Sequence, residues 1–225
     1  MPSPKRVFLA ILAVLLLLPP STCAFDTPLS SEAIREAYFL GQRRDDSLAR
    51  FLGQYTRYLD PPRSGPHISS MTFFTPFALA VHSSSLHTAG YSAQQAEIDH
   101  RKHAESVRII VQIQFTDSFG ALIPAPAGSR SDAPRGYVLR PYDFWKDFDV
   151  SIFNSRSEDA QPLRPFSSGG EPNLSCGDNG GCTLTGATLY FDLLAKSFES
   201  GEAVVEVRPP EGDPVALEFD LASFR

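Results

Sequence analysis

The 225-residue sequence lacks the short motifs that mark common catalytic and metal sites. It contains no G-x-S-x-G nucleophile elbow, no H-E-x-x-H zinc helix, no phosphate-binding glycine loop and no EF-hand ligand series. These absences disfavour the corresponding enzymes and metal proteins, and we expect neither a cofactor nor a resident metal. They do not exclude an enzyme whose site is assembled from distant segments.

Positive charge is scarce as well. The chain has 20 Lys and Arg against 26 Asp and Glu, a formal net charge of −6. This balance disfavours binding to nucleic acid or attraction to anionic lipid. With 42% hydrophobic residues and 17 phenylalanines, the chain can build a core and does not have a disordered composition. The length suits one domain or two small ones.

The longest apolar run near the start has only 12 residues, Val7 to Leu18, whereas a membrane-spanning helix needs about 20. Lys5 and Arg6 precede this run, and prolines and small residues follow it up to Ala24. That order is typical of a secretory signal peptide. We therefore expect residues 1–24 to be removed, leaving an exported chain, periplasmic or secreted, that begins at Phe25. Loss of the two basic residues takes the net charge from −6 to −8.

Cys23 leaves an alternative open, which is lipid modification of that cysteine and attachment to a membrane. Thr22 precedes it where Gly or Ala is usual, and Pro20 stands where Leu is usual. We therefore expect a membrane association of this kind only if Cys23 is lipidated.

Two cysteines remain in the exported chain, Cys176 and Cys182, separated by the flexible sequence GDNGG. Oxidising compartments favour disulfides, so we expect these two to be bonded and to shape the tip of a hairpin. Closing a loop this short stabilises the folded state less than closing a long loop. A metal site here would need more ligands than the neighbouring Asp178 and Asn179.

Residues 25–136 form the first predicted region, with helices and strands. The apolar spacing predicts two helices within residues 30–59, capped by Ser30 or Ser31 and by Asp45 or Asp46, and a third helix at 92–104. Residues 68–82 are rich in strand formers but contain Pro76, which predicts an edge strand or a bulge. Residues 107–115 alternate strictly enough to predict a strand with one buried face, and residues 120–136 predict a mobile loop or linker.

Residues 137–225 form the second predicted region, which is rich in β-structure. The alternation after Phe148 opens a strand, and three more short strands are expected at 187–194, 203–207 and 215–221, the last two joined as a hairpin. Residues 154–181 are rich in Ser, Pro and Gly and predict a loop. The whole pattern predicts an α+β fold, with N-terminal helices packed on a mainly antiparallel sheet and then a small β-sandwich-like C-terminal module.

Trp145 is the only tryptophan, and Asp143, Asp147 and Asp149 surround it. Carboxylates beside an aromatic ring are common in carbohydrate sites, so this cluster is a candidate binding surface or, in the alternative reading, the acid and base of a hydrolase. A purely structural role is the simpler interpretation, because Asp149 is the outward residue of an alternating strand.

Histidines offer two weaker candidates. Glu97, His100 and His103 are spaced three apart on the predicted third helix, but the outer two point about 120° apart, so a solvated face is the simpler reading. His82 and His87 flank the serines at 83–85, yet catalytic triads are rarely built from neighbours in sequence.

The stretches SEAIREAYFLGQRR, Ser31 to Arg44, and GYSAQQAE, Gly90 to Glu97, resemble segments of uncharacterised exported bacterial proteins. The resemblance covers the N-terminal half and implies no catalytic residue. We expect an exported, non-catalytic binding or structural protein of the bacterial cell envelope, whose partner is a protein or another envelope component. The alternative is an envelope carbohydrate hydrolase that uses the carboxylates around Trp145.

Overall fold

The computed structural model describes residues 24–225, apart from 88–89, 126–135, 156–159, 178–179 and 199–200. Four helices lie in the first half of the described chain: α2 (Ser31–Gly41), α3 (Asp46–Gly53), α4 (Pro76–Leu86) and α5 (Ala93–Arg101). The strands are β1 (Thr56–Tyr58), β2 (His67–Phe74), β3 (Ser106–Gln114), β4 (Leu122–Pro124), β5 (Tyr137–Leu139), β6 (Asp149–Phe153), β7 (Ser167–Cys176), β8 (Cys182–Leu194), β9 (Glu202–Arg208) and β10 (Val215–Asp220). Short 3₁₀ turns lie at Phe144–Asp147, Ala195–Ser197 and Leu221–Ser223.

The central strand is β3, as the alternation of residues 107–115 predicts. Val107, Ile109, Val111 and Ile113 are fully buried, while the residues between them are half-buried. This strand is the middle of a five-stranded sheet with the order β1-β2-β3-β8-β7, in which all neighbours are antiparallel. The predicted α+β class with mainly antiparallel sheets is therefore confirmed.

The five-stranded sheet draws strands from both sides of residue 136, the predicted boundary between the two regions. The whole length of β3 pairs with β8, from Ser106 opposite Leu194 to Gln114 opposite Gly186. Strands from the two predicted regions therefore belong to the same sheet.

Strand β7 lies within residues 154–181, so the prediction of a loop throughout this segment is wrong. The strand occupies an edge of the sheet, where Pro172 costs the ladder little. Gly169 and Gly170 are also required by packing, because a Cβ at those positions would lie 2.5 Å from the Tyr190 hydroxyl and 2.6 Å from the Trp145 ring. Proline and glycine usually interrupt strands, but in β7 they are compatible with the strand.

A second sheet has the order β10-β9-β6 and packs on the first one through a common core. The inward side chains of β9, Ala203, Val205 and Val207, are fully buried, as is Phe219 of β10. The predicted hairpin between the last two strands is present, since Val215 of β10 lies opposite Val207 of β9. Phe73 of β2 contacts Phe219 and Phe198 at centroid distances of 5.5 and 5.3 Å, so aromatic rings join the two layers.

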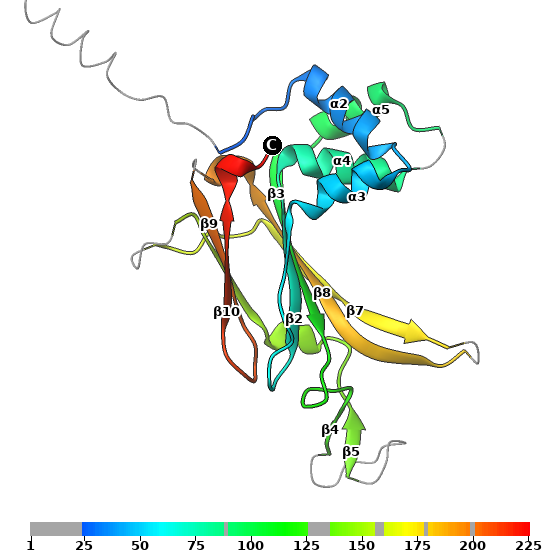
Figure 1. Ribbon diagram of the computed structural model, residues 1–225, viewed down its shortest axis with the longest axis vertical. Coiled ribbons are helices and arrows are strands. Elements are labelled where there is room, and N and C mark those ends of the chain that lie inside the picture. Colours follow the sequence, from blue (N-terminus) through cyan, green and yellow to red (C-terminus); the bar gives the residue numbers. More distant parts are fainter. Residues whose placement is uncertain (1–23, 88–89, 126–135, 156–159, 178–179, 199–200) are drawn as a thin grey trace, which may run out of the picture.

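The helices gather at one end of the sheets (Figure 1). The two predicted N-terminal helices are present with the predicted caps: the Ser30 side chain accepts from the Ala33 amide, and the Asp45 side chain accepts from the Ser47 amide. The third is α5, whose cap is Ser92. No helix in the described part of the chain is long and apolar enough to cross a membrane.

Pro76 begins helix α4, so the prediction of an edge strand or a bulge at this proline is wrong. Strand β2 ends at Phe74, the Thr75 hydroxyl accepts from the Ala78 amide at 3.2 Å, and Pro76 occupies the first helical turn. Proline suits this position because the amide it lacks would have no partner in the helix. Thr75 and Pro76 thus mark the junction between strand β2 and helix α4.

The predicted signal peptide and Cys23 lie outside the described residues, but the predicted first residue of the exported chain does not. The Phe25 side chain is buried in the common core, where its ring contacts Phe73 and Phe198 at centroid distances of 6.1 and 6.3 Å. Phe25, the predicted first residue of the exported chain, is thus part of the common core.

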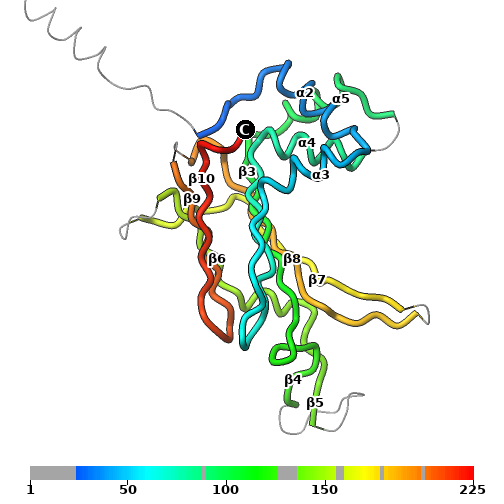
Figure 2. The backbone as a smooth tube through the Cα atoms, viewed as in Figure 1, coloured from blue at the N-terminus to red at the C-terminus, as the bar shows by residue number. Residues whose placement is uncertain are grey.

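The prediction of a loop or linker over residues 120–136 is wrong at the two ends of this segment, which form strands. Strands β4 and β5 pair with each other as a two-stranded ladder, with Leu122 opposite Leu139 and Pro124 opposite Tyr137. Residues 126–135 between them lie outside the described part of the chain. Figure 2 shows this hairpin at the end of the molecule opposite the helices.

Candidate functional site

The hairpin formed by β7 and β8 extends away from the rest of the molecule (Figures 1 and 2). The ladder between β8 and β3 ends at Gly186, and the last backbone hydrogen bond on that side runs from the Phe115 amide to the Thr185 carbonyl at 2.9 Å, whereas β8 continues beside β7 to Cys182. The end of the hairpin is thus a two-stranded ribbon. Isolated two-stranded ribbons are marginally stable in water, so this one needs a further constraint.

The predicted disulfide supplies that constraint. Cys176 and Cys182 are bonded and lie opposite each other in the ladder, with a Cα to Cα distance of 4.0 Å. Beyond the bond, the Gly177 amide donates to the Gly181 carbonyl at 2.9 Å, and Gly180 adopts a positive φ of 78°. The bond therefore fixes the register of the two strands at the tip, as expected from the spacing of the cysteines.

A chain of polar side chains crosses the outward face of the sheet where the hairpin leaves it. The Thr188 hydroxyl lies 3.0 Å from both the Gln112 and the Asn173 side-chain oxygens, which come from β3 and β7. Further along, Arg108 of β3 donates two hydrogen bonds, at 2.7 and 2.9 Å, to the carboxylate of Asp192 of β8. The contacts through Thr188 thus join the root of the hairpin to the central strand, and the Arg108 to Asp192 pair joins β3 and β8 nearer the other end of the ladder.

The cluster around Trp145 combines a half-buried ring with three exposed carboxylates. The Trp145 ring lies against Gly170 of β7, and the neighbouring Phe144 and Phe148 are buried in the common core. Asp143, Asp147 and Asp149 are all exposed, and Asp143 forms an ion pair with Lys146 at 3.0 Å. A hydrogen bond from Lys146 lowers the pKa of Asp143. A glycosidase acid needs a raised pKa in an enclosed site, so this geometry gives the hydrolase alternative no support.

The structure gives His100 a different partner from those suggested by its helical spacing. Its Nε2 lies 2.7 Å from Oε1 of Glu105, which also accepts from the Leu29 amide at 3.0 Å. Glu97 instead contacts Ser31 and Arg101. Among the described residues, no group of three histidine, cysteine or acidic side chains is placed to hold a metal ion.

His82 and His87 are not brought together with the serines as a catalytic set. The His82 ring packs on Phe74 at a centroid distance of 5.3 Å, and burial lowers its pKa. The His87 ring stacks on Tyr91 at 3.9 Å, and the Ser85 hydroxyl donates to the backbone carbonyl of His82. Each side chain is therefore engaged in local packing.

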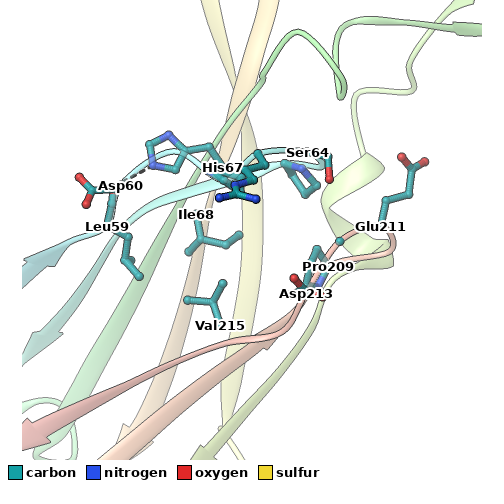
Figure 3. A pocket seen from close by; sticks show the side chains of 13 residues that line it. Leu59, Asp60, Ser64, His67, Ile68, Pro209, Glu211, Asp213 and Val215 are labelled. Atoms are coloured by element: carbon teal, nitrogen blue, oxygen red, sulfur yellow. Dashed lines mark hydrogen bonds between the residues drawn. The ribbon is translucent and has the colours of Figure 1, made fainter.

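A cavity of about 270 Å³ lies where the β1 to β2 connection meets the β9 to β10 turn. Ile68 and Val215 lie side by side at its apolar wall, and Ser64 and Glu211 come from the two turns (Figure 3). The His67 ring donates from Nε2 to the Leu59 carbonyl at 2.8 Å. The cavity is smaller than usual ligand pockets, and its histidine is engaged in holding the turn, so the site is a junction between the two sheets.

The hairpin is the feature that sequence reasoning identified only in part. The cysteine spacing predicted the tip, but nothing in the Ser, Pro and Gly composition of residues 154–181 indicated that a long edge strand precedes it. The polar chain through Gln112 and Thr188 carries no motif, because it joins residues far apart in sequence.

No protein-family model matches the chain, and no curated protein is similar to it.

Proposed function

We propose that this protein is an exported, non-catalytic binding protein of the bacterial cell envelope, and that its β7–β8 hairpin contacts a protein partner. The observation that carries the proposal is the hairpin itself, which leaves the body of the molecule and is closed at its tip by a disulfide. Such a bond persists in oxidising compartments outside the cytoplasm, which fits the predicted export.

The chemistry of the hairpin suits a protein partner. Strand β7 is the last strand of its sheet, so its outer edge carries backbone amides and carbonyls with no neighbouring strand among the described residues. An extended segment of another protein can add to such an edge. Leu174, at 47% exposure near the tip, supplies an apolar contact beside the open edge.

The test is photo-crosslinking in the producing cells. A photoreactive amino acid replaces Leu174 on the hairpin, and a control chain carries it at Leu86 of α4, which is 69% exposed. We expect a discrete protein adduct from position 174 and none from position 86. Failure to form an adduct at 174, or the same adducts from both positions, would contradict the proposal.

A further inference from the structure

The outward face of the five-stranded sheet carries side chains that the proposed function does not use. The second sheet packs on the opposite face, where Val107 and Val111 enter the common core. On the outward side, helix α4 packs over one end of β2 and β3, where Leu79 lies near Phe74 and Ile110. The β7–β8 hairpin extends away from both the helices and the second sheet (Figure 1). The outward face is thus most open along β8 and β7.

Polar side chains lie in two adjacent rows on this open part of the sheet. In the first row, Gln112 of β3, Thr188 of β8 and Glu171 of β7 lie opposite one another. In the second row, Gln114 of β3 and Asn173 of β7 lie on the two sides of β8. Gln114 and Glu171 are exposed, and the other three are half-buried. We name these five side chains together with Tyr190 the polar face.

The hydrogen-bonding groups of the polar face are not used up within it. The Thr188 hydroxyl has one hydrogen but lies 3.0 Å from both Oε1 of Gln112 and Oδ1 of Asn173, so one of these oxygens is left to accept from elsewhere. Each of the two carboxamides also has two N–H donors, and their one contact as donors among the described residues runs from Nδ2 of Asn173 to Oε1 of Gln112 at 3.5 Å. The polar face therefore offers both donors and acceptors to a ligand.

Tyr190 supplies a flat aromatic surface beside the amides. A Cβ at Gly169 would lie 2.5 Å from the Tyr190 hydroxyl and 2.6 Å from the ring carbon that carries it, so the ring lies across the backbone of β7. The Tyr190 side chain is half-buried, because one side of the ring rests on the strand. The face of an aromatic ring is electron-rich and attracts groups with a partial positive charge. The outer side of this ring is a platform on which a flat ligand can stack.

The polar face carries little charge. Glu171 is its one carboxylate, and it contains no Lys or Arg. Beside it, Arg108 of β3 and Asp192 of β8 neutralise each other through hydrogen bonds of 2.7 and 2.9 Å. An anionic ligand would be repelled by Glu171, and a cationic ligand would gain one exposed carboxylate, which salt screens. This charge balance favours a neutral ligand.

We propose that the polar face binds a neutral polysaccharide with flat, equatorially substituted sugar rings, of the cellulose or chitin type. The faces of such a ring carry C–H bonds, which stack on Tyr190. Its edge carries hydroxyl groups, which both donate to and accept from the side chains of Gln112 and Asn173. This goes beyond the proposed protein partner of the β7–β8 hairpin and adds a second envelope component, a glycan.

A protein partner fits this face less well. The backbone groups of β3 and β8 are paired in ladders on both sides, so an extended peptide can add only at the outer edge of β7. The centres of protein interfaces are rich in aromatic and apolar side chains, whereas Tyr190 is the one such side chain of the polar face. The polar face therefore suits a ligand that bonds to side chains through many hydroxyl groups.

The experiment titrates the isotope-labelled, oxidised exported chain with cellohexaose and chitohexaose and follows it by NMR. We expect the side-chain amide signals of Gln112 and Asn173 to shift, with a Kd of about 1 mM or lower for at least one hexaose. Tyr190→Ala should weaken binding at least about tenfold, whereas Tyr190→Phe keeps the ring and should change it less than about threefold. The control Tyr142→Ala removes a tyrosine that is 60% exposed outside the polar face and should leave the Kd unchanged.

The amide shifts are measured on the wild type, so the test does not depend on the folding of a variant. Absence of these shifts at about 10 mM of each hexaose would overturn the proposal. So would equal binding by wild type and a folded Tyr190→Ala chain, or an equal loss in the Tyr142→Ala control. Tighter binding of polygalacturonate, an anionic glycan, would also contradict it. None of these outcomes bears on crosslinking from Leu174, which lies outside the polar face.

Discussion

Glu105 links three segments through one carboxylate at the start of β3. It accepts hydrogen bonds from His100 of α5 and from the backbone amide of Leu29, and its side chain is only 17% exposed. Burial opposes ionisation of this group, but the two hydrogen bonds, with support from the charge of Arg101, outweigh burial and lower its pKa below 4.5. The charged form is thus favoured in the folded state.

This geometry predicts an acid-dependent stability. A carboxyl group whose pKa is lower in the folded than in the unfolded state adds stability above its unfolded pKa and loses it as the pH falls. We expect Glu105→Gln to cost about 1 to 3 kcal/mol at pH 7. Its unfolding free energy should fall less steeply than that of the wild type below about pH 4.5. Urea titrations across pH measure both quantities. The exposed Glu32→Gln serves as control, and equal slopes for wild type and Glu105→Gln would refute this role.

Two helical glycines provide a matched pair. A Cβ at Gly41 would lie 2.3 Å from the Val81 carbonyl oxygen of α4, whereas a Cβ at Gly53 would meet nothing within 4 Å. Gly41→Ala should therefore lower stability by about 1 to 3 kcal/mol, because α2 and α4 must separate. Gly53→Ala should leave it unchanged or raise it by up to about 1 kcal/mol. Thermal unfolding compares the two variants, and equal effects would contradict the close approach of α2 and α4.

At the scale of elements, the disulfide should hold the tip of the β7–β8 hairpin and little else. In the double variant Cys176→Ser/Cys182→Ser, we expect a loss of up to about 2 kcal/mol from the short closed loop. The amides between Gly186 and the tip of the hairpin should exchange hydrogen faster, whereas exchange should stay slow where β8 pairs with β3. Loss of protection in β3 itself would show that the bond supports the whole sheet.

Elements with a regular period could be predicted from sequence, and irregular ones could not. The alternation from Val107 to Ile113 gives β3 directly, and short polar side chains at Ser30, Asp45 and Ser92 give three helix starts. The prediction at Pro76 is wrong because the effect of a proline depends on whether the chain at that point is extended or begins a helix. Strand β7 could not be predicted because its glycines leave room for the side chains of Tyr190 and Trp145, which are distant in sequence.

The candidate sites also divide into those that the sequence predicts and those that it does not. The bond between Cys176 and Cys182 follows from spacing and compartment, and the structure confirms it. The β4–β5 ladder could not be anticipated, because Leu122 and Leu139 become neighbours only when β4 and β5 pair. Pairing across a long connection leaves no local pattern in either three-residue strand.

At the scale of the whole molecule, the two sheets share one core, and Phe73 is at its centre. Its fully buried ring contacts Phe25 of the N-terminal segment, Phe198, and Phe219 of the second sheet. We expect Phe73→Ala to cost about 3 to 5 kcal/mol and both sheets to unfold in one transition. Urea unfolding followed by near- and far-ultraviolet circular dichroism provides the test. Two separate transitions would show that the sheets are independent.

Export is the claim on which the proposed function depends, and the intact mass of the protein purified from its producing cells tests it most directly. We predict a chain that begins at Phe25 and gains about 2 Da on reduction, because the Cys176 to Cys182 bond is present. A chain that retains residues 1–24 and shows no change on reduction would place the protein in a reducing compartment and contradict the account.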